Sequence, residues 1–259
     1  MKHSLFLSGK GVLVTREEAQ AEQLCTMIAE HGGVPIKVPL LSFQKVDADR
    51  LESVKEKLSR LESFDWIVFT SKPGVDLFCE MLNEMEFEGI YPKIAAIGKK
   101  TKAALQEHGL QPTFIPPKYV AESFLPAFLE VVDMSESVLI IKGDLARNYL
   151  FNGLIAAGIH TEESVIYSNR MPEDSEQALV DVLTNKKIDI LLFTSPSTVN
   201  HFMKTVKKYH LFDCLIDKVT VAIGPVTRKR VEELGVAVTL CPEQYTVDEM
   251  MKELRQYYS

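Results

Sequence analysis

Two short stretches of the chain place a threonine and a serine at the same kind of corner, where an apolar run meets a helical pattern. They read FTSKPGVDLF at residues 69–78 and FTSPSTVNHF at residues 193–202. A strand that turns at once into a helix leaves free N–H groups at the helix N-terminus, where Ser and Thr are preferred caps. Because the helix dipole adds to these donors, such a corner can bind an anion without a lysine or arginine. Anion-binding corners are therefore predicted at Ser71 and Ser195.

A second motif, AIGxxT, occurs twice and predicts two further corners. Gly98 and Gly224 end the apolar runs, and Thr101 and Thr227 follow as the expected caps. In a doubly wound sheet these corners all lie at the carboxyl edge, where ligands bind. For any one of these residues, a helix cap without a further role is the alternative interpretation. Four equivalent corners that face one cleft favour a ligand with several negative charges, held between two domains.

An internal duplication organises the chain. AIGKKTKAALQEHG begins at Ala96 and AIGPVTRKRVEELG at Ala222, a shift of 222 − 96 = 126 residues. The same shift lays VLVTREEAQAEQLCTMIAEHGG, from Val12, over VLIIKGDLARNYLFNGLIAAGI, from Val138. The two FTS corners differ by 194 − 70 = 124, which implies a small change of loop length before them. Matches in one register indicate that a single unit was repeated.

Short apolar runs alternate with helical patterns in each half of the chain. The strand-length runs of the first half are GVLVT, DWIVFT, KIAAIG and PTFIP. The helix expected after Thr15 ends at Gly32 and Gly33, a second ends at Gly109, and a third, ESFLPAFLEVV, carries Pro126. This alternation predicts an α/β fold with two doubly wound parallel-sheet domains of the flavodoxin-like type, which arise from the duplication and are joined by two short linkers.

Composition excludes several classes of protein. The length of 259 residues favours two domains, and 46% apolar with 25% charged residues is typical of soluble globular chains. A net charge of −7 argues against a general nucleic-acid binder and against an anionic membrane surface as partner. No export signal or membrane span is expected, and the four scattered cysteines are typical of reduced thiols in the cytoplasm.

Cofactor motifs are missing from the sequence, and few cations stand at the expected cleft. There is no P-loop and no dinucleotide-binding motif, and the six histidines show no metal spacing, so neither a dinucleotide nor a metal is expected. Arg16, Lys142 and Arg147 lie in or just after the first strand of each half, where they could line the cleft. A solvated side chain at the start of a helix is the alternative for each of the three.

Taken in order along nearly the whole chain, these residues resemble the uroporphyrinogen-III synthase family. The resemblance rests on VLVTR near the start, VPLLSF at 38–43, two FTS corners, two AIGxxT motifs, LIIKGDLAR at 139–147 and Tyr167. It implies an enzyme of haem and sirohaem biosynthesis, a carbon–oxygen lyase that uses no cofactor or metal. Its substrate would be the linear tetrapyrrole hydroxymethylbilane, which carries eight carboxylates. The product would be uroporphyrinogen III, formed as the last ring is inverted, the macrocycle closes and water leaves.

The resemblance also implies a domain division and residue roles. By analogy, residues 1–38 with 172–259 form one domain, and residues 42–167 form the other. Tyr167 becomes the candidate catalytic residue, because its phenol can donate a proton to the departing hydroxyl; a tyrosine that only packs at a linker is the alternative. The family usually has Arg where this chain has Lys142, and a lysine replaces a two-pronged grip on carboxylate with a point charge. The expected substrate-binding residues are Arg16, Ser71, Gly98, Thr101, Lys142, Gly143, Arg147, Ser195, Gly224 and Thr227.

Two other functions share the two-lobed architecture. A solute-binding or sensor protein also closes two α/β lobes on a ligand, but the former should carry an export signal and the latter an output segment. A two-lobed sugar-nucleotide transferase would need a longer chain. For the synthase, a monomer with a small-molecule substrate is expected, without nucleic acid or membrane and with a transient contact to the preceding enzyme of the pathway as a further option.

Overall fold

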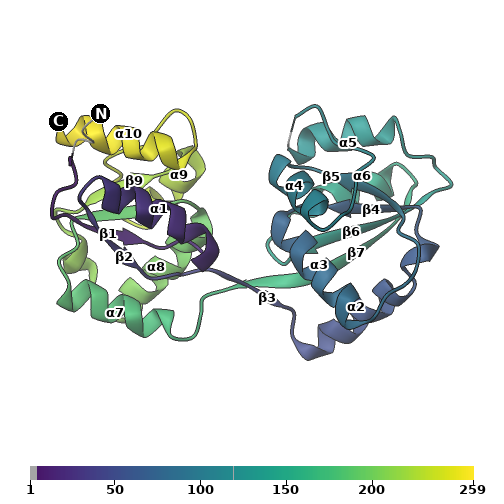
Figure 1. Cartoon of the computed structure of the whole chain (residues 1–259), viewed down its shortest axis with the longest axis horizontal. Coiled ribbons are helices and arrows are strands. Elements are labelled where there is room, and N and C mark those ends of the chain that lie inside the picture. The colour runs from purple at the N-terminus through teal and green to yellow at the C-terminus, as the bar shows by residue number, and fades with distance from the viewer. Residues whose placement is uncertain (1–4, 119) are drawn as a thin grey trace. The chain divides into compact units, whose positions relative to one another are not determined.

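The computed structural model describes residues 5–118 and 120–259 and divides into two compact units (Figure 1). Unit 1 comprises Met1–Ser42 and Arg170–Ser259, and unit 2 comprises Phe43–Asn169. The division lies close to the boundaries expected from the sequence, 1–38 with 172–259 and 42–167. It is displaced by a few residues because two neighbouring strands of unit 2, β3 (Ser42–Lys45) and β7 (His160–Arg170), extend to it.

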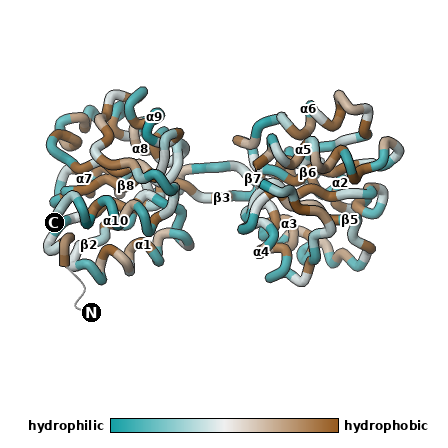
Figure 2. The backbone as a smooth tube through the Cα atoms, turned by 90° about the horizontal axis from the view of Figure 1, so that it is seen from above, coloured by the Kyte–Doolittle hydropathy of each residue, from teal (hydrophilic) through white to brown (hydrophobic). Residues whose placement is uncertain are grey.

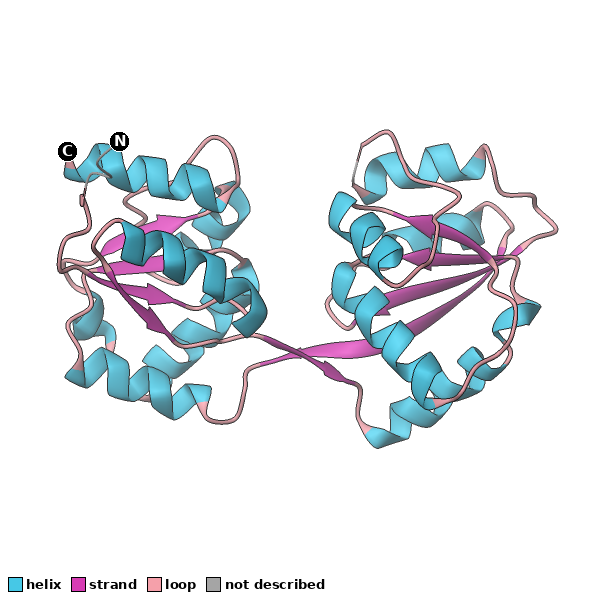
Figure 3. Ribbon diagram, viewed as in Figure 1, coloured by secondary structure: helices cyan, strands magenta, loops and turns pink. Residues whose placement is uncertain are grey.

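Unit 1 is a parallel four-stranded sheet covered by helices on both faces (Figure 3). The strand order is β2-β1-β8-β9, and every pairing that links them is parallel. The strands are β1 (Gly11–Val14), β2 (Val34–Lys37), β8 (Ile190–Phe193) and β9 (Val219–Ala222). The helices are α1 (Glu18–Glu30), α7 (Ser175–Asn185), α8 (Pro196–Lys208), α9 (Pro225–Glu233) and α10 (Val247–Tyr258), with a 3₁₀ turn at Phe212–Leu215.

The central strands of unit 1 are apolar on both faces, which is why they appear as continuous apolar runs. Leu13 and Leu191 pack against α7 and α8, whereas Val12 and Val14 face the opposite way, against α1 and α10. Figure 2 shows the corresponding hydrophobic strands inside a more polar shell of helices. Side chains alternate between the two faces of a strand, so a strand covered on both sides must be apolar at every position.

Unit 2 repeats this architecture with one strand more. Its sheet has the order β3-β7-β6-β4-β5. The remaining strands are β4 (Trp66–Phe69), β5 (Lys93–Ala96) and β6 (Ser137–Gly143). The helices are α2 (Ala48–Ser59), α3 (Lys72–Glu84), α4 (Lys99–Glu107), α5 (Ala121–Leu129) and α6 (Tyr149–Ala156), with a 3₁₀ turn at Leu61–Ser63. Ile67 and Phe69 pack against α2, α3 and α4, and Trp66 and Val68 against α5 and α6.

The duplication is visible in the order of the strands. The 126-residue shift carries β1, β2 and β9 onto β6, β7 and β5, and the 124-residue shift carries β8 onto β4. The sheet β2-β1-β8-β9 of unit 1 therefore matches β7-β6-β4-β5 of unit 2. Each unit thus combines the first strand–helix–strand segment of one half with the later segments of the other half.

The helix ends expected at glycines are confirmed. Gly32 and Gly109 have positive φ angles of 80° and 75°, and their repeat partners Gly158 and Gly235 have 83° and 90°. This left-handed conformation ends a helix at little cost only for glycine. The helix with the internal proline is confirmed as well, because Pro126 lies inside α5.

The prediction of a strand at PTFIP, residues 112–116, is wrong. Phe114 makes a single bridge to Ala95, and its repeat partner Leu240 makes a single bridge to Val221. Pro112 and Pro116 flank the bridge, and a proline has no N–H with which to extend a ladder of hydrogen bonds. The segment therefore runs beside the sheet edge without forming a strand.

Candidate functional site

The corners at Ser71 and Ser195 are helix caps, as the sequence predicts. Ser71 Oγ accepts the N–H of Gly74 at 3.2 Å at the start of α3, and Ser195 Oγ accepts the N–H of Thr198 at 3.2 Å at the start of α8. Each helix also has a proline in its first two positions, which offers no N–H. Most first-turn donors of α3 and α8 are therefore satisfied or missing, which leaves little for an anion.

The caps expected at Thr101 and Thr227 are wrong. The N-cap residues of α4 and α9 are Gly98 and Gly224, which have no side chain to offer. The two threonines stand at the third helix position and are only 3% exposed each. Helical side chains lean toward the N-terminus, which carries the Thr101 hydroxyl over the cap. A Cβ built on Gly98 would lie 3.5 Å from Thr101 Oγ1.

At the Gly98 and Gly224 corners, first-turn donors remain that the serine side chains bind at the other two corners. Among the residues that the structure describes, the backbone N–H groups of Lys100 and Thr101 have no hydrogen-bond acceptor, and neither has the Thr101 hydroxyl. The N–H groups of Val226 and Thr227 and the Thr227 hydroxyl are in the same condition within the described ranges. Neither threonine oxygen is among the buried, unpartnered side-chain atoms of the described residues, so both hydroxyls are accessible at the corners and can donate to a ligand.

Tyr167 occupies the carboxyl end of β7, buried against the core of unit 2. It is 7% exposed, and its ring meets the Phe43 ring edge-on at a centroid distance of 5.6 Å. Its Oη lies 2.9 Å from Ser71 Oγ, the atom that caps α3. A Cβ on Gly143 would lie 2.3 Å from Tyr167 Cζ, so the ring occupies space that only a glycine leaves open. Gly143 thus acts by making room for the phenol.

The phenol is held in its protonated form. Burial raises the pKa of Tyr167 above its usual value, and the charge of Asp144 raises it further, while the hydrogen bond with Ser71 works in the opposite direction. Asp144 is itself fixed, because Oδ1 accepts from the backbone N–H and the side-chain amide of Asn169 at 3.0 and 2.7 Å. A phenol in this environment can donate a hydrogen bond or a proton at neutral pH.

Lys142 differs from the exposed cation that the sequence predicts. It is 4% exposed, and its Nζ forms an ion pair with Glu163 and donates to Asn148 Oδ1 at 2.7 Å. Lys142 is buried because it is the sixth residue of the seven-residue strand β6, and its side chain lies on a covered face of the sheet. Its charge is neutralised inside unit 2.

Arg16 and Arg147 are more accessible than Lys142. Arg16, the repeat partner of Lys142, is partly buried and donates from Nη2 to Gln20 Oε1 at 2.7 Å. Burial lowers the pKa of Arg16 and the charge of Glu17 raises it, yet a guanidinium stays charged at neutral pH. The side chain of Arg147 is 69% exposed and pairs with Glu122 Oε1 at 2.7 Å. Of the three expected cations, these two are available to a ligand.

Arg147 borders a pocket of about 250 Å³ at the carboxyl edge of unit 2. Thr70 and Ile97, which follow β4 and β5, form part of its wall. The other lining residues are Val120, Ala121, Glu122, Ala146, Tyr149 and Leu150. Sequence reasoning missed Glu122 and Tyr149; the available signal was an aromatic residue two positions after Arg147.

The structure groups the expected residues within each unit. Unit 2 brings Ser71, Gly143 and Tyr167 into direct contact.

Among residues 5–118 and 120–259, no group of three or more His, Cys, Asp or Glu side chains could hold a metal ion. Over the same residues, no helix is long and apolar enough to cross a membrane.

The sequence profile described as uroporphyrinogen-III synthase HemD matches residues 22–252. The chain belongs to the uroporphyrinogen-III synthase family. A relative from Methanothermobacter thermautotrophicus, provisionally named a uroporphyrinogen-III synthase, is 32% identical over 93% of this chain and 96% of its own length. The uroporphyrinogen-III synthase of Synechococcus elongatus is 24% identical over 97% of this chain and 96% of its own length.

Solved structures of this family share the fold. A mutant uroporphyrinogen III synthase from Thermus thermophilus superposes with a TM-score of 0.65 at 18% identity, covering 96% of this chain and 98% of the other. The Helicobacter pylori enzyme gives 0.59 at 19% identity, covering 94% and 97%. The flavodoxin-like α/β fold expected from the sequence is confirmed.

Proposed function

We propose that this chain closes hydroxymethylbilane to uroporphyrinogen III with inversion of the last pyrrole ring and loss of water, as a carbon–oxygen lyase. The single observation that carries the chemistry is the pair of hydroxyls, Ser71 Oγ and Tyr167 Oη, 2.9 Å apart at the carboxyl edge of unit 2. The family match supports this function over a solute-binding protein, a sensor or a sugar-nucleotide transferase.

The donors for eight substrate carboxylates come from backbone as much as from side chains. The Gly98 and Gly224 corners each offer two N–H groups and a threonine hydroxyl that have no partner among the described residues. Arg16 and Arg147 add positive charge, and Arg147 stands beside the pocket of unit 2. Helix N-termini bind carboxylates through such N–H groups and the helix dipole. An acidic protein can therefore hold a polyanion with few cations.

Tyr167 supplies the proton in this proposal. The bond between carbon and the leaving hydroxyl breaks as the pyrrole nitrogen pushes electrons toward the carbon, and Tyr167 Oη gives the hydroxyl a proton so that it departs as water. A raised pKa makes the phenol a weak acid, so the push from the nitrogen does most of the work. Ser71 Oγ, which can donate to Tyr167 Oη, stabilises the negative charge that develops on the phenol. Positioning of the reacting ends supplies the remainder.

The test is the identity of the product. The protein is incubated with enzymatically made hydroxymethylbilane, the products are oxidised, and the uroporphyrin isomers are separated by chromatography. We expect isomer III in excess over a protein-free control, which gives the isomer I of spontaneous closure. Isomer I alone in both samples would overturn the assignment.

Location and assembly remain part of the proposal. The four cysteines are free thiols, which supports a reducing compartment such as the cytoplasm. We propose that the chain acts as a monomer, because the donors described above come from one chain.

A further inference from the structure

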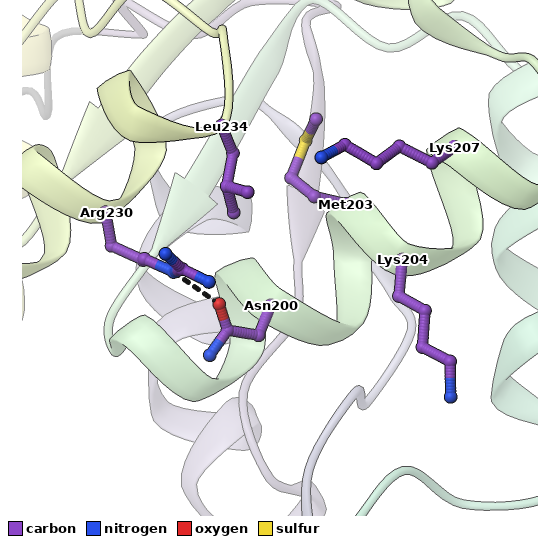
Figure 4. Close-up of a pocket in the computed structure, with 6 residues that line it drawn as sticks. All are labelled: Asn200, Met203, Lys204, Lys207, Arg230 and Leu234. Carbon is purple, nitrogen blue, oxygen red and sulfur yellow. Dashed lines mark hydrogen bonds between the residues drawn. The ribbon is translucent and has the colours of Figure 1, made fainter.

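A second hollow lies in unit 1 where α8 packs beside α9 (Figure 4). This α8–α9 pocket has a volume of about 270 Å³. It is lined by Asn200, Met203, Lys204, Lys207, Arg230 and Leu234. Its residues lie along the middle and later turns of α8 and the end of α9, whereas the corners at Ser195 and Gly224 precede the first turns. The α8–α9 pocket is thus separate from the corners described above.

The floor is apolar and one cation is held in position. Met203 is 2% exposed and belongs to the core of unit 1, and Leu234 packs against the same core. Arg230 Nε donates to Asn200 Oδ1 at 2.5 Å, and its Nη1 lies 3.1 Å from Glu233 Oε2. A guanidinium has five N–H donors, so these two partners leave further donors available.

The two lysines add positive charge and are held in no direct ion pair among the described residues. Within the described residues, Lys204 and Lys207 form no hydrogen bond or ion pair. Figure 4 shows the Lys207 side chain extending toward Met203, while Lys204 points away from Arg230. Besides Glu233, the nearby acidic residue is Glu176 of α7, which pairs with Lys208 and whose pKa is lowered by that hydrogen bond and also by the charge of Lys204. The surface around the pocket is therefore positive on a chain whose net charge is −7.

The duplicated helices of unit 2 show that the fold does not require these cations. Under the repeat shifts, Asn200, Lys204, Lys207, Arg230 and Leu234 correspond to Asp76, Glu80, Asn83, Ala104 and His108. In unit 2 the acidic residues are consumed by internal pairs, because Asp76 contacts His108 at 3.2 Å and Glu80 contacts Lys45 at 3.0 Å. The same helix pair thus packs with acidic residues in unit 2 and with basic residues in unit 1.

We propose that the α8–α9 pocket binds an organic anion, whose phosphate or carboxylate group contacts Arg230 and Lys207 and whose apolar part lies over Met203 and Leu234. Arginine and lysine together are the side chains that recognise such groups, arginine through two parallel hydrogen bonds and lysine through its point charge. The apolar floor favours an organic anion over an inorganic one, because burial of its apolar surface adds to binding.

The experiment titrates the full chain with phenyl phosphate, benzoate and inorganic phosphate by isothermal calorimetry at fixed salt. A double variant, Arg230→Gln with Lys207→Gln, removes two pocket charges. The matched control, Arg228→Gln with Lys208→Gln, removes one arginine from α9 and one lysine from α8 that do not line the pocket. Thermal melting of both variants verifies that they are folded.

We expect phenyl phosphate or benzoate to bind the unaltered chain, and to bind the pocket variant at least about tenfold more weakly and the control variant unchanged. Preference between the two probes identifies the anionic group. Equal weakening in both variants would show general charge attraction and overturn the site. Binding of inorganic phosphate as tight as phenyl phosphate would overturn the organic part of the proposal, and no binding of any probe would overturn all of it.

Discussion

The hydroxyl of Tyr167 lies 2.9 Å from the hydroxyl of Ser71, and the same Ser71 oxygen accepts the Gly74 N–H that begins α3. The position of the Tyr167 hydroxyl, the proposed proton donor, therefore depends on the residue that caps α3. One oxygen serves two neighbours, so a change at either residue has consequences that separate catalysis from packing.

Tyr167→Phe keeps the ring against Gly143 and removes only the donor. We expect turnover to fall by about 10–100-fold, at or below the low end of the roughly 10²–10⁴-fold of general acid catalysis, because the pyrrole nitrogen drives most of the departure. The residual product should remain mainly isomer III, since ring orientation does not depend on the proton. Initial rate, isomer ratio and melting temperature are measured together. A less stable variant with normal turnover would instead make Tyr167 a packing residue.

Ser71→Ala and Thr246→Ala form a matched pair of cap deletions. Thr246 caps α10 through the N–H of Glu249 at 3.3 Å and contacts no candidate residue. Each variant should lose about 0.5–2 kcal/mol of stability. Only Ser71→Ala should also lower turnover, because it removes the partner of the phenol. Equal turnover per folded molecule in the two variants would show that Ser71 has no role in catalysis.

Much of the fold could be predicted from the sequence because it depends on local patterns. Apolar runs, glycines at helix ends and the repeat register were enough to predict the alternation of strands and helices. The exception is PTFIP, which has the composition of a strand but contains two prolines. A proline has no N–H for the hydrogen bonds between strands, and the segment makes only a single bridge to the neighbouring strand.

The candidate site was harder to predict because its properties depend on partners distant in sequence. Lys142 reads as a free cation until Glu163, 21 residues away, is placed beside it. Thr101 is expected to be a cap because threonine is a preferred N-cap residue, but the N-cap of α4 is Gly98, three residues earlier. Gly143 gained its role only when the Tyr167 ring was found against it.

The ion pair of Lys142 with Glu163 should be structural. Lys142→Met leaves Glu163 without its cation, and breaking a buried pair costs about 3–5 kcal/mol; we expect the lower end because the Glu163 side chain is 20% exposed. Adding Glu163→Gln should recover part of that loss. Chemical denaturation of the single and double variants measures both effects. A stable single variant with a raised KM would show that Lys142 contacts the substrate.

Glu136 should make unit 2 sensitive to acid. The ion pair with Lys93, the N–H of Asp133 and the indole N–H of Trp66 hold the pKa of Glu136 at about 2. A depressed pKa contributes stability above the unfolded value near 4.5, and that contribution is lost as the pH falls toward 2. The free energy of unfolding should therefore fall more steeply between pH 5 and pH 2 for the unaltered chain than for Glu136→Gln. Chemical denaturation at a series of pH values measures both. Parallel curves would exclude this carboxylate as the cause.

Thr101→Val tests whether the glycine corners bind substrate through donors that the free protein leaves unused. Valine keeps the shape of threonine and removes a hydroxyl that has no partner among the described residues, so stability should be unchanged or slightly higher. If a substrate carboxylate accepts from this hydroxyl, KM should rise by about 2–13-fold, which corresponds to about 0.5–1.5 kcal/mol for one hydrogen bond. Thr205→Val is the control, since Thr205 is equally buried but donates to His201 O at 3.3 Å within α8. That variant should lose stability and keep its KM. A normal KM for Thr101→Val would leave the backbone N–H groups of Lys100 and Thr101 as the corner's contribution, because they are unaffected by the substitution.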